Sequence, residues 1–345
     1  MRAAYIKDHG NLEQIQIGEV DIPNIRSNDV LIETKFGALN HLDLFVIRGW
    51  PGLELSMPHV IGADGSGIIK EIGSEVSTVS EGDRVTINPG ISCGKCNMCL
   101  SGKQILCKQF SILGENKWGS FAEYIKVPET NVINIPDNYP FDKAAAAPLT
   151  FLTAWRMLTT LAKTKYNDIV FIHGAGGGVA SAAIQIAKFF GAKVIATTST
   201  QKKMEKAKEL GADHVINYKE MKNFTKFVYT ELTNRHGIDV VIDNVGQATF
   251  PTSIQLLRPG GKLITCGVTS GPFTKINITD IFWKHLEIKG STMANQGEFR
   301  EVMKLIFEGK LNPIIDKVFP LENTQAAEQY LSESIQFGKI LIKVS

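Results

Sequence analysis

The 345-residue sequence lacks several features that would assign it to a class at once. No run approaches the roughly 18 apolar residues that a membrane-spanning helix needs. The N-terminal stretch MRAAYIKDHG has neither the apolar core nor the cleavage site of a signal peptide. Neither sign of charge is in excess, because 37 basic residues balance 35 acidic ones. We therefore expect a cytoplasmic protein that has neither nucleic acid nor a membrane as its partner.

Cysteine is also scarce, and four of the five cysteines lie close together. Cys93, Cys96, Cys99 and Cys107 have the spacing C-x2-C-x2-C-x7-C. Zinc takes four tetrahedral ligands, and thiolates this close in sequence can reach one ion from a tight loop. We predict one structural zinc ion per chain, whose full coordination shell leaves no position for a substrate. Four unrelated thiols, a redox pair and an iron–sulfur cluster are the alternatives.

The first 150 residues show the pattern of a β-rich domain. Short alternating apolar runs recur between Gly, Pro, Asn and Asp residues, which is typical of antiparallel, barrel-like domains. In Pro58–Lys70, three glycines surround a strand and predict bends where backbones approach closely. The predicted strands cover residues 3–6, 30–35, 67–72, 84–87 and 121–127.

After residue 150, strands alternate with helices. Six short strands over about 120 residues, with helices between them, predict a doubly wound parallel sheet. A chain of this length also favours two domains. The predicted strands are 168–173, 193–198, 214–217, 238–243, 262–266 and 286–290. The tail after residue 290, with helices at 298–308 and 324–332 and a strand at 339–344, is too short for a domain of its own. We expect the tail to complete the first domain, so that residues 1–149 and 291–345, with a zinc lobe at 90–107, surround a second domain of residues 150–290.

A glycine-rich segment joins the first strand and helix of that second domain. It reads AGGGVA at residues 175–180, and Val179 follows its three glycines. Gly176, Gly177 and Gly178 allow a sharp turn and a close approach to a pyrophosphate, whose charge is favoured at a helix N-terminus. Alanine replaces two glycines of the strict G-x-G-x-x-G pattern. The segment predicts a dinucleotide site, and a glycine turn without a ligand is the alternative.

The end of the next predicted strand favours one cofactor. Sites specific for NAD place Asp or Glu there to bind the ribose 2′-hydroxyl. This chain has Thr198, Ser199 and Lys203 within the segment TTSTQKK, which contains no carboxylate. Hydroxyls and lysines can bind a 2′-phosphate, so NADP(H) is favoured over NAD(H). The alternative is that the lysines simply begin the following helix.

These features together resemble the medium-chain dehydrogenase/reductase superfamily, in particular its zinc-containing alcohol dehydrogenase-like and NADPH:quinone oxidoreductase-like branch. The resemblance covers essentially the whole chain. It implies an α/β fold in which a Rossmann doubly wound parallel sheet is inserted in a β-rich GroES-like catalytic domain, with the active site in the cleft between the two. It also implies a small-molecule substrate and a homodimer or homotetramer. The matching segments are ALNHLDLFVIRGWP (38–51), GADGSG (62–67), EGDRV (81–85), the cysteine lobe, GSFAEY (119–124), PLTFLTAW (148–155), HGAGGGVA (173–180) and FGKILIKV (337–344).

The sequence departs from this family at a second, catalytic zinc site. By motif, Asn40 stands where the family has a metal-binding Cys, Ala63 where it has a His, and Leu149 near its third ligand. Alanine and leucine offer no lone pair, and asparagine is a poor zinc ligand. The resemblance therefore implies that the catalytic zinc is absent, as in the quinone oxidoreductase-like branch.

Without that Lewis acid, the expected reaction is hydride transfer from NADPH to an activated carbonyl acceptor, either a quinone or an α,β-unsaturated carbonyl. Asn40 and Asp64 are the candidate catalytic residues. By its place in the motif, Asn40 would lie beside the nicotinamide and bond the acceptor carbonyl. Thr153, Asp243 and Lys339 are further candidate cofactor contacts.

Some expectations rest only on comparison with the family. Asp43 and Lys339 match a pair that meets near the cofactor phosphates.

Two other functions stay open. One is an alcohol dehydrogenase with an unusual metal site built from Asp64 with nearby His41, Asp43 or His59. The other is a non-catalytic NADPH-binding protein.

Overall fold

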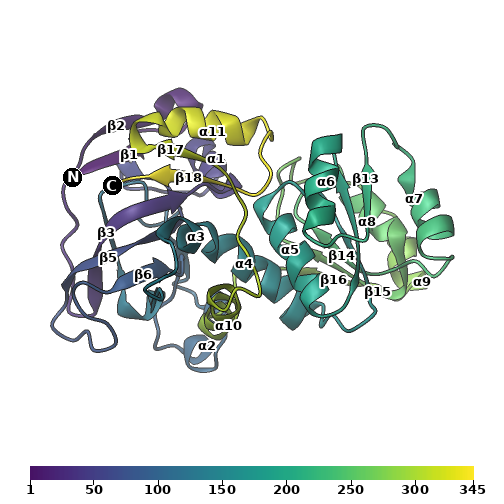
Figure 1. Cartoon of the computed structure of the whole chain (residues 1–345), viewed down its shortest axis with the longest axis horizontal. Coiled ribbons are helices and arrows are strands. Elements are labelled where there is room, and N and C mark those ends of the chain that lie inside the picture. The colour runs from purple at the N-terminus through teal and green to yellow at the C-terminus, as the bar shows by residue number, and fades with distance from the viewer. The chain divides into compact units, whose positions relative to one another are not determined.

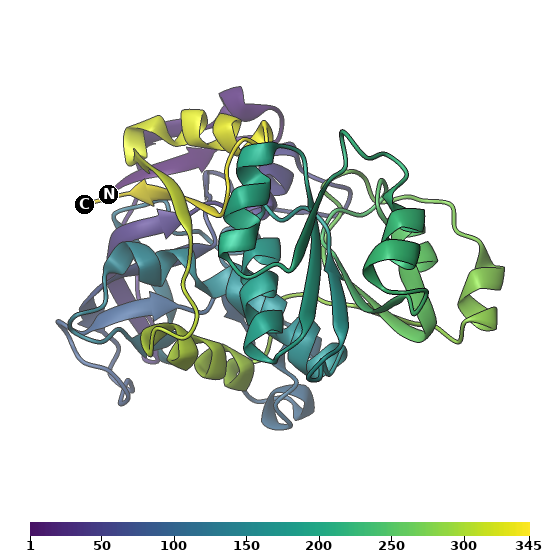
Figure 2. The same cartoon turned by 45° about the vertical axis from the view of Figure 1, so that its right-hand side comes forward.

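The computed structural model describes all 345 residues and divides the chain into two compact units (Figure 1). Unit 1 contains Met1–Leu152 and Met293–Ser345, and unit 2 contains Thr153–Thr292. Both ends of the chain thus build unit 1, where Figures 1 and 2 show the two termini close together. No helix combines the length and the apolar composition that crossing a membrane requires.

Unit 1 consists mainly of β-structure. Its strands are β1 (Arg2–Ile6), β2 (Gln16–Glu19), β3 (Asp29–Ala38), β4 (His59–Val60), β5 (Asp64–Ile72), β6 (Arg84–Ile87), β7 (Gly90–Ile91), β8 (Ser111–Ile112), β9 (Tyr124–Pro128), β10 (Val132–Asn134), β17 (Ile315–Pro320) and β18 (Lys339–Lys343). A seven-stranded sheet has the order β10-β6-β5-β3-β18-β17, with β9 also paired to β3. A three-stranded sheet has the order β2-β1-β4, and β7 pairs with β8. Every pairing is antiparallel except β17 with β18.

The C-terminal tail is an integral part of unit 1. β18 pairs with β3, so that Leu341 lies opposite Ala38 although the two are far apart in the sequence. Helix α10 follows the return of the chain, and its buried residues Phe299, Val302, Met303 and Ile306 repeat at the helical period. The helices of unit 1 are α1 (His41–Arg48), α2 (Asn97–Leu100), α3 (Phe141–Ala146), α10 (Gln296–Phe307) and α11 (Thr324–Ser332), and α4 (Pro148–Trp155) continues into unit 2.

Glycines of unit 1 mark close backbone approaches, as the sequence predicts. A Cβ atom on Gly67 would lie 2.1 Å from the carbonyl oxygen of Glu33, on the paired strand. Gly62 has a φ of +98°, and a Cβ there would lie 2.5 Å from the ring of Phe121. Phe121 is fully buried. Larger residues at either glycine would therefore displace the backbone or this ring.

Unit 2 is a six-stranded, wholly parallel sheet. Its strands are β11 (Ile169–Ile172), β12 (Lys193–Thr198), β13 (His214–Asn217), β14 (Ile238–Asp243), β15 (Leu257–Thr265) and β16 (Glu287–Gly290). The order is β13-β12-β11-β14-β15-β16, which is the doubly wound topology. The helices are α5 (Gly178–Phe189), α6 (Gln201–Glu209), α7 (Phe224–Phe227), α8 (Phe250–Leu256) and α9 (Ile278–Trp283). In Figure 2 the teal helices α5 and α6 cover one face of the sheet, and the green helices α7 and α8 cover the other.

The central strands of unit 2 are buried on both faces. All six residues of β14 are buried, and Phe171 of β11 packs with Val241 and Leu263 in one apolar cluster. Strands covered on both faces by helices are expected to be apolar runs, and both β11 (IVFI) and the middle of β14 (Val240–Ile242) are apolar. The predicted α/β class, a doubly wound parallel sheet inserted in a β-rich domain, is confirmed.

Candidate functional site

The four clustered cysteines converge on one point in unit 1. The sulfur atoms of Cys93, Cys96, Cys99 and Cys107 all lie within 4.8 Å of one another. The Sγ–Sγ distances are 3.9 Å from Cys93 to Cys99 and 3.6 Å from Cys96 to Cys99. Four thiolates at about 2.3 Å from a tetrahedral zinc would be separated by about 3.8 Å. The arrangement therefore fits a single zinc ion, which four thiolates would coordinate completely.

The loop around these cysteines stabilises the thiolate form of Cys93. Backbone N–H groups of Lys95 and Cys96 donate toward the sulfur of Cys93 and lower its pKa to about 6. Thiolate is the form that binds a metal ion. The loop is also fastened to α10, because the backbone N–H of Ile105 donates to the side-chain oxygen of Asn295, the N-cap residue of that helix, at 3.3 Å.

A second polar cluster in unit 1 forms around Asn40, which precedes α1. The side-chain nitrogen of Asn40 donates to the carbonyl oxygen of Ala38 at 3.2 Å and to Oδ2 of Asp64 at 3.0 Å. Its side-chain oxygen accepts from the ammonium of Lys339 at 2.6 Å. The amide is thus fully engaged: both of its hydrogens are committed to protein acceptors.

Lys339 and Asp64 form a buried ion pair inside this cluster. Their charged atoms lie 3.0 Å apart, and the exposed fractions of the side chains are 4% and 0%. The ammonium also donates to the carbonyl oxygen of Leu39 at 2.6 Å, so its three hydrogens have three acceptors. The other oxygen of Asp64 accepts from the backbone N–H of Leu149 at 2.7 Å. We call Asn40, Asp64 and Lys339 the lysine cluster.

The lysine cluster contains one of the three positions where the family motif has catalytic-metal ligands, Asn40, and it does not fit a zinc ion. Asn40 and Asp64 already bind the Lys339 ammonium. Ala63 is buried and has no donor atom, and Leu149 contributes only a backbone N–H. In the whole chain, the four cysteines are the only group of three or more His, Cys, Asp or Glu side chains close enough to share an ion.

The histidines that could have built an unusual metal site are not assembled into one. His59 is buried and its Nε2 lies 3.1 Å from the carbonyl oxygen of Gly114. Burial, with help from the charges of Lys339 and Arg48, lowers the pKa of His41 to about 4. Neither histidine lies in a group of metal-binding side chains.

Unit 1 contains two further buried carboxyl groups, those of Asp43 and Glu328. Oδ2 of Asp43 accepts from the backbone N–H of Asn40 at 2.7 Å, whereas its Oδ1 and both oxygens of Glu328 have no hydrogen-bond partner. Burial raises the pKa of Asp43 to about 7, and burial together with the charge of Asp43 raises the pKa of Glu328 well above its usual value. Asp43 therefore does not pair with Lys339 directly; Lys339 pairs with Asp64.

Glu328 is a residue that the sequence analysis missed. It lies in α11 on the face formed by the buried residues Thr324, Ala327 and Leu331. That spacing is the apolar stripe of a helix, and a glutamate in the stripe is the signal of an unusual buried carboxyl.

The glycine segment of unit 2 has the geometry of an anion-binding loop. It follows β11 and ends at α5, whose N-cap is Gly177. Gly174 has a φ of +67°, and the backbone N–H of Ala175 donates to the carbonyl oxygen of Thr197 at 2.8 Å. The loop is thereby fixed to the end of β12 and leaves the first turn of α5 to face a negative charge.

The predicted 2′-phosphate segment lies at the end of β12. Thr198 is buried, and Thr200 caps α6 by accepting from the backbone N–H of Lys203 at 3.3 Å. Ser199 stands between them. The segment from residue 197 to 203 offers hydroxyls and ammonium groups and no carboxylate.

Three other candidate cofactor residues belong to unit 2. Asp243 ends β14, and its Oδ1 accepts from the backbone N–H groups of Val245 and Gly246, each at 3.0 Å. Thr153 is buried in α4, and Val179 is half-buried in the first turn of α5. Their contacts with a cofactor stay predictions.

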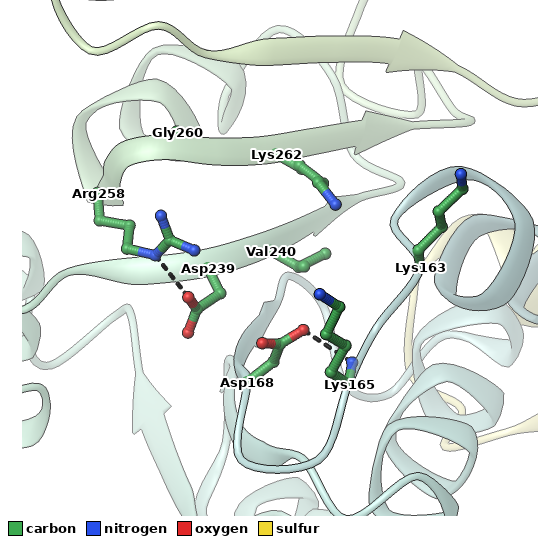
Figure 3. A pocket seen from close by; sticks show the side chains of 8 residues that line it. All are labelled: Lys163, Lys165, Asp168, Asp239, Val240, Arg258, Gly260 and Lys262. Carbon is green, nitrogen blue, oxygen red and sulfur yellow. Dashed lines mark hydrogen bonds and ion pairs between the residues drawn. The ribbon is translucent and has the colours of Figure 1, made fainter.

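A small cavity of about 80 Å³ lies elsewhere in unit 2 (Figure 3). Its lining comes from the beginning of the strands, the end opposite to the glycine loop. Ligands of doubly wound sheets bind at the carboxyl ends. Nε of Arg258 pairs with Asp239 at 2.5 Å, so part of its charge is already neutralised. The lining residues are Lys163, Lys165, Asp168, Asp239, Val240, Arg258, Gly260 and Lys262.

The doubly wound sheet with its glycine loop defines unit 2 as a dinucleotide-binding domain. Residues 178–308 match the zinc-binding dehydrogenase family, and residues 26–137 match the alcohol dehydrogenase GroES-like domain. The chain belongs to the zinc-type medium-chain dehydrogenase/reductase superfamily, as its motifs predict. Unit 2 is the Rossmann domain of that fold, and unit 1 contains the GroES-like domain.

Similar proteins with three different names cover almost the whole chain. A crystal structure titled as an NAD-dependent alcohol dehydrogenase is 40% identical, covers 100% of both chains and superposes with a TM-score of 0.96. An acryloyl-coenzyme A reductase of Sulfurisphaera tokodaii is 29% identical over 97% of this chain and 98% of its own. A quinone oxidoreductase of Lama guanicoe is 29% identical over 99% of this chain and 97% of its own.

Proposed function

We propose that this oxidoreductase transfers hydride from NADPH to an activated carbonyl acceptor, a quinone or an α,β-unsaturated carbonyl, without a catalytic zinc ion. The observation that carries the proposal is the lysine cluster. Of the three positions where the family motif has metal ligands, Asn40 binds the Lys339 ammonium, Ala63 is buried and has no donor atom, and Leu149 contributes only its backbone N–H. The names of the acryloyl-coenzyme A reductase and the quinone oxidoreductase support the same class of acceptor.

The chemistry follows from that donor set. Oxidation of an unactivated alcohol gains from a Lewis acid that stabilises the alkoxide. An enone or quinone is already electrophilic, so hydride transfer to it needs mainly orientation and stabilisation of the oxygen that becomes negative. Asn40 and Asp64 are the proposed catalytic residues. Both hold the Lys339 ammonium, whose charge Asp64 balances, so we propose that they act by positioning that group. Because both amide hydrogens of Asn40 are engaged by Ala38 and Asp64, the expected bond from Asn40 to the acceptor carbonyl would have to replace one of these contacts.

NADPH is the proposed hydride donor, bound by the Rossmann domain. Gly176, Gly177, Gly178 and Val179 would bind its pyrophosphate at the start of α5, and Thr198, Ser199 and Lys203 would bind its 2′-phosphate. Thr153 and Asp243 complete the proposed contacts. Lys339 stays a proposed cofactor contact from the family motif, although all three of its hydrogens are engaged within unit 1.

A separate zinc ion is proposed for the cysteine lobe. Cys93, Cys96, Cys99 and Cys107 would hold one ion per chain, and its role would be to cross-link the loop. Four closely spaced thiols without a disulfide are typical of a reducing compartment, which supports a cytoplasmic setting.

The experiment that tests the function measures NADPH oxidation with a panel of benzoquinones, enals, enones and an acryloyl thioester, beside NAD(P)⁺ reduction with primary and secondary alcohols. We expect turnover with at least one quinone or enone, no turnover with alcohols, and a lower KM for NADPH than for NADH. Tight NADPH binding without turnover of any acceptor would instead identify a non-catalytic NADPH-binding protein.

An alcohol dehydrogenase is the second candidate, because the 40% identical structure carries that title with NAD as cofactor. It requires a metal site that the lysine cluster does not offer. Alcohol-dependent NAD⁺ reduction that a chelator abolishes, with two zinc ions per chain, would establish this candidate and exclude the first.

A homodimer or a homotetramer is also proposed, with a second copy of the chain covering an apolar surface of unit 2. β16 is the last strand of its sheet and has no partner beyond it. In the segment that precedes β16 in the sequence, the side chains of Phe273, Ile278 and Trp283 have exposed fractions of 82%, 67% and 73%. Aromatic residues this exposed are typical of interfaces. Light scattering after size exclusion should give a mass of at least two chains, and the substitution Trp283→Asp should lower it.

A further inference from the structure

A buried polar chain in unit 2 links His173, Ser253 and Asp243. The Oγ atom of Ser253 lies 2.7 Å from Oδ2 of Asp243 and 3.0 Å from Nε2 of His173. The exposed fractions of the three residues are 2% for His173 and 0% for the other two. The three come from separate places in the sequence, and we call them the serine bridge.

The chemistry of the three groups gives the bridge a direction. A carboxylate only accepts, so the hydroxyl of Ser253 donates to Asp243 and is free to accept from an N–H of His173. Burial, opposed in part by the charge of Asp243, lowers the pKa of His173 to about 4. The ring is then neutral, with its one N–H on Nε2. Each hydrogen bond of the bridge has one donor and one acceptor.

The serine bridge spans the point where the order of the strands reverses. β11 and β14 are neighbours in the sheet although they are the first and fourth strands of unit 2. In doubly wound sheets, the dinucleotide lies at this switch point, beyond the carboxyl ends of the strands. His173 follows β11, Asp243 ends β14, and Ser253 reaches both from α8.

Each end of the bridge holds one loop. His173 directly precedes the glycine loop, Gly174–Gly178. Asp243 fastens the loop 244–249 through two backbone N–H groups and through the hydroxyl of Thr249, which lies 2.8 Å from Oδ1. On its other side the loop packs closely against Gly267, where a Cβ atom would lie 2.5 Å from the carbonyl oxygen of Asn244.

We propose that Ser253 and His173 are positioning residues for the dinucleotide: the serine bridge sets the separation of the glycine loop from the loop 244–249. The inference rests on the proposed function only in that a nicotinamide dinucleotide binds these loops. A bridge of buried, directly hydrogen-bonded groups holds its geometry more rigidly than apolar packing would. Removing the hydroxyl of Ser253 leaves the buried carboxylate of Asp243 with one hydrogen-bond donor fewer and allows the two loops to separate.

The test compares Ser253→Ala with a matched buried hydroxyl. Thr233 is 5% exposed, donates to the carbonyl oxygen of Tyr229 and accepts from the N–H of Gly237, ahead of β14 at the other end of the sheet. Ser253→Ala should raise the Kd for NADPH, measured by fluorescence titration, by about tenfold. Thr233→Val should lower the melting temperature about as much as Ser253→Ala does, and it should leave the Kd for NADPH unchanged. Ser253→Thr, which keeps the hydroxyl, should recover most of the affinity.

A second variant cuts the bridge at its other end. His173→Phe keeps an aromatic ring beside Phe171, whose centroid is 5.0 Å away, and replaces the imidazole by a slightly larger ring without nitrogen atoms. The variant should weaken NADPH binding as Ser253→Ala does. It should change kcat at saturating NADPH by less than about threefold. If Ser253→Ala does not fold, this variant replaces it in the test. Wild-type affinity in either folded variant would overturn the inference alone. A wild-type protein that binds neither NADPH nor NADH would overturn the proposed function and this inference together.

Discussion

The cysteine lobe and the lysine cluster both lie in unit 1, and they treat positive charge in opposite ways. In the lobe, four sulfur atoms within 4.8 Å of one another form a negative site that fits an added cation. In the lysine cluster, the acceptors Asn40 and Asp64 are already satisfied by the ammonium of Lys339. One region can bind an added metal ion, and the other contains its own cation. This difference is the physical basis of our proposal that the chain has a structural zinc and no catalytic one.

The two regions also differ in what a lost partner would leave behind. Without zinc, the thiols of the lobe can take up protons, and two of the four are only half-buried. Without Lys339, the carboxyl group of Asp64 would be left at zero exposure without its cation. A buried charge without a partner is among the costliest defects in a protein. Substitutions and metal removal can test this contrast, from the largest expected effect to the smallest.

The largest effect is expected from Lys339→Met, which keeps the length of the side chain and removes the charge. It should lower the free energy of unfolding by about 3–5 kcal/mol, because Asp64 loses its buried cation. Urea unfolding measures the change. Lys343→Met, at the exposed end of the same strand, is the control and should change stability by less than about 0.5 kcal/mol. Adding Asp64→Asn to Lys339→Met should restore part of the loss, and a double variant no more stable than the single one would argue against the ion pair.

Cys107→Ser is expected to abolish zinc binding at the lobe and to destabilise unit 1 by about 2–4 kcal/mol, since a structural zinc contributes directly to folding. Metal analysis and the melting temperature report the two effects. Cys266→Ala, in unit 2, should keep the zinc content of the wild type. A Cys107→Ser protein with unchanged zinc and unchanged melting temperature would show that the lobe is not a zinc site.

Glu328→Gln should stabilise the protein at neutral and alkaline pH. The folded-state pKa of Glu328 is raised, so the folded protein holds this proton more tightly than the unfolded chain does. The wild type therefore loses stability as the pH rises above about 4.3, the value in an unfolded chain. Glutamine mimics the protonated form, so the variant should gain about 1–3 kcal/mol at pH 8 and nothing near pH 4.

Unfolding curves at several pH values between about 4 and 8 measure this difference. Glu333→Gln, at the exposed end of the same helix, should show no such pH dependence. A gain for Glu328→Gln that is equal at both pH values would mean that the pKa of Glu328 does not differ between the folded and the unfolded chain, and that packing alone is responsible.

The smallest effect is expected for catalysis after zinc removal. A chelator that empties the lobe should lower the melting temperature, yet leave kcat for the quinone or enone acceptor within about twofold at low temperature, because the lobe supplies no group to the reaction. Loss of turnover in proportion to zinc, without unfolding, would move the metal from a structural to a catalytic role.

How far the sequence could predict these two regions depends on how local each one is. The four cysteines lie within fifteen residues, so their spacing alone predicted a common ligand. Asn40, Asp64 and Lys339 are separated by up to 299 residues, and only β18, pairing beside β3, brings them together. The family resemblance named all three residues but matched Lys339 with Asp43. The ion pair with Asp64 needed the fold.

The same reasoning applies to the secondary structure. Strong periodic segments such as β11, β14 and α10 were predicted within a few residues of their bounds. Strands β4, β7 and β8 have two residues each, too few to show any period, and they were not predicted. The short strands β2 and β10 were not predicted either. β17 was also missed, because it follows Pro313 and ends at Pro320 in a stretch that reads as a loop. The fold class and the family are confirmed, while the roles of the site residues stay predictions.

Metal stoichiometry tests the contrast between the two regions most directly. Purified wild-type protein should contain one zinc ion per chain, and Cys107→Ser should contain none, as measured by mass spectrometry of the metal beside the protein concentration. Two zinc ions in the wild type, with one kept by Cys107→Ser and lost on Asp64→Asn, would show that the lysine cluster yields to a metal ion and would contradict a zinc-independent reaction.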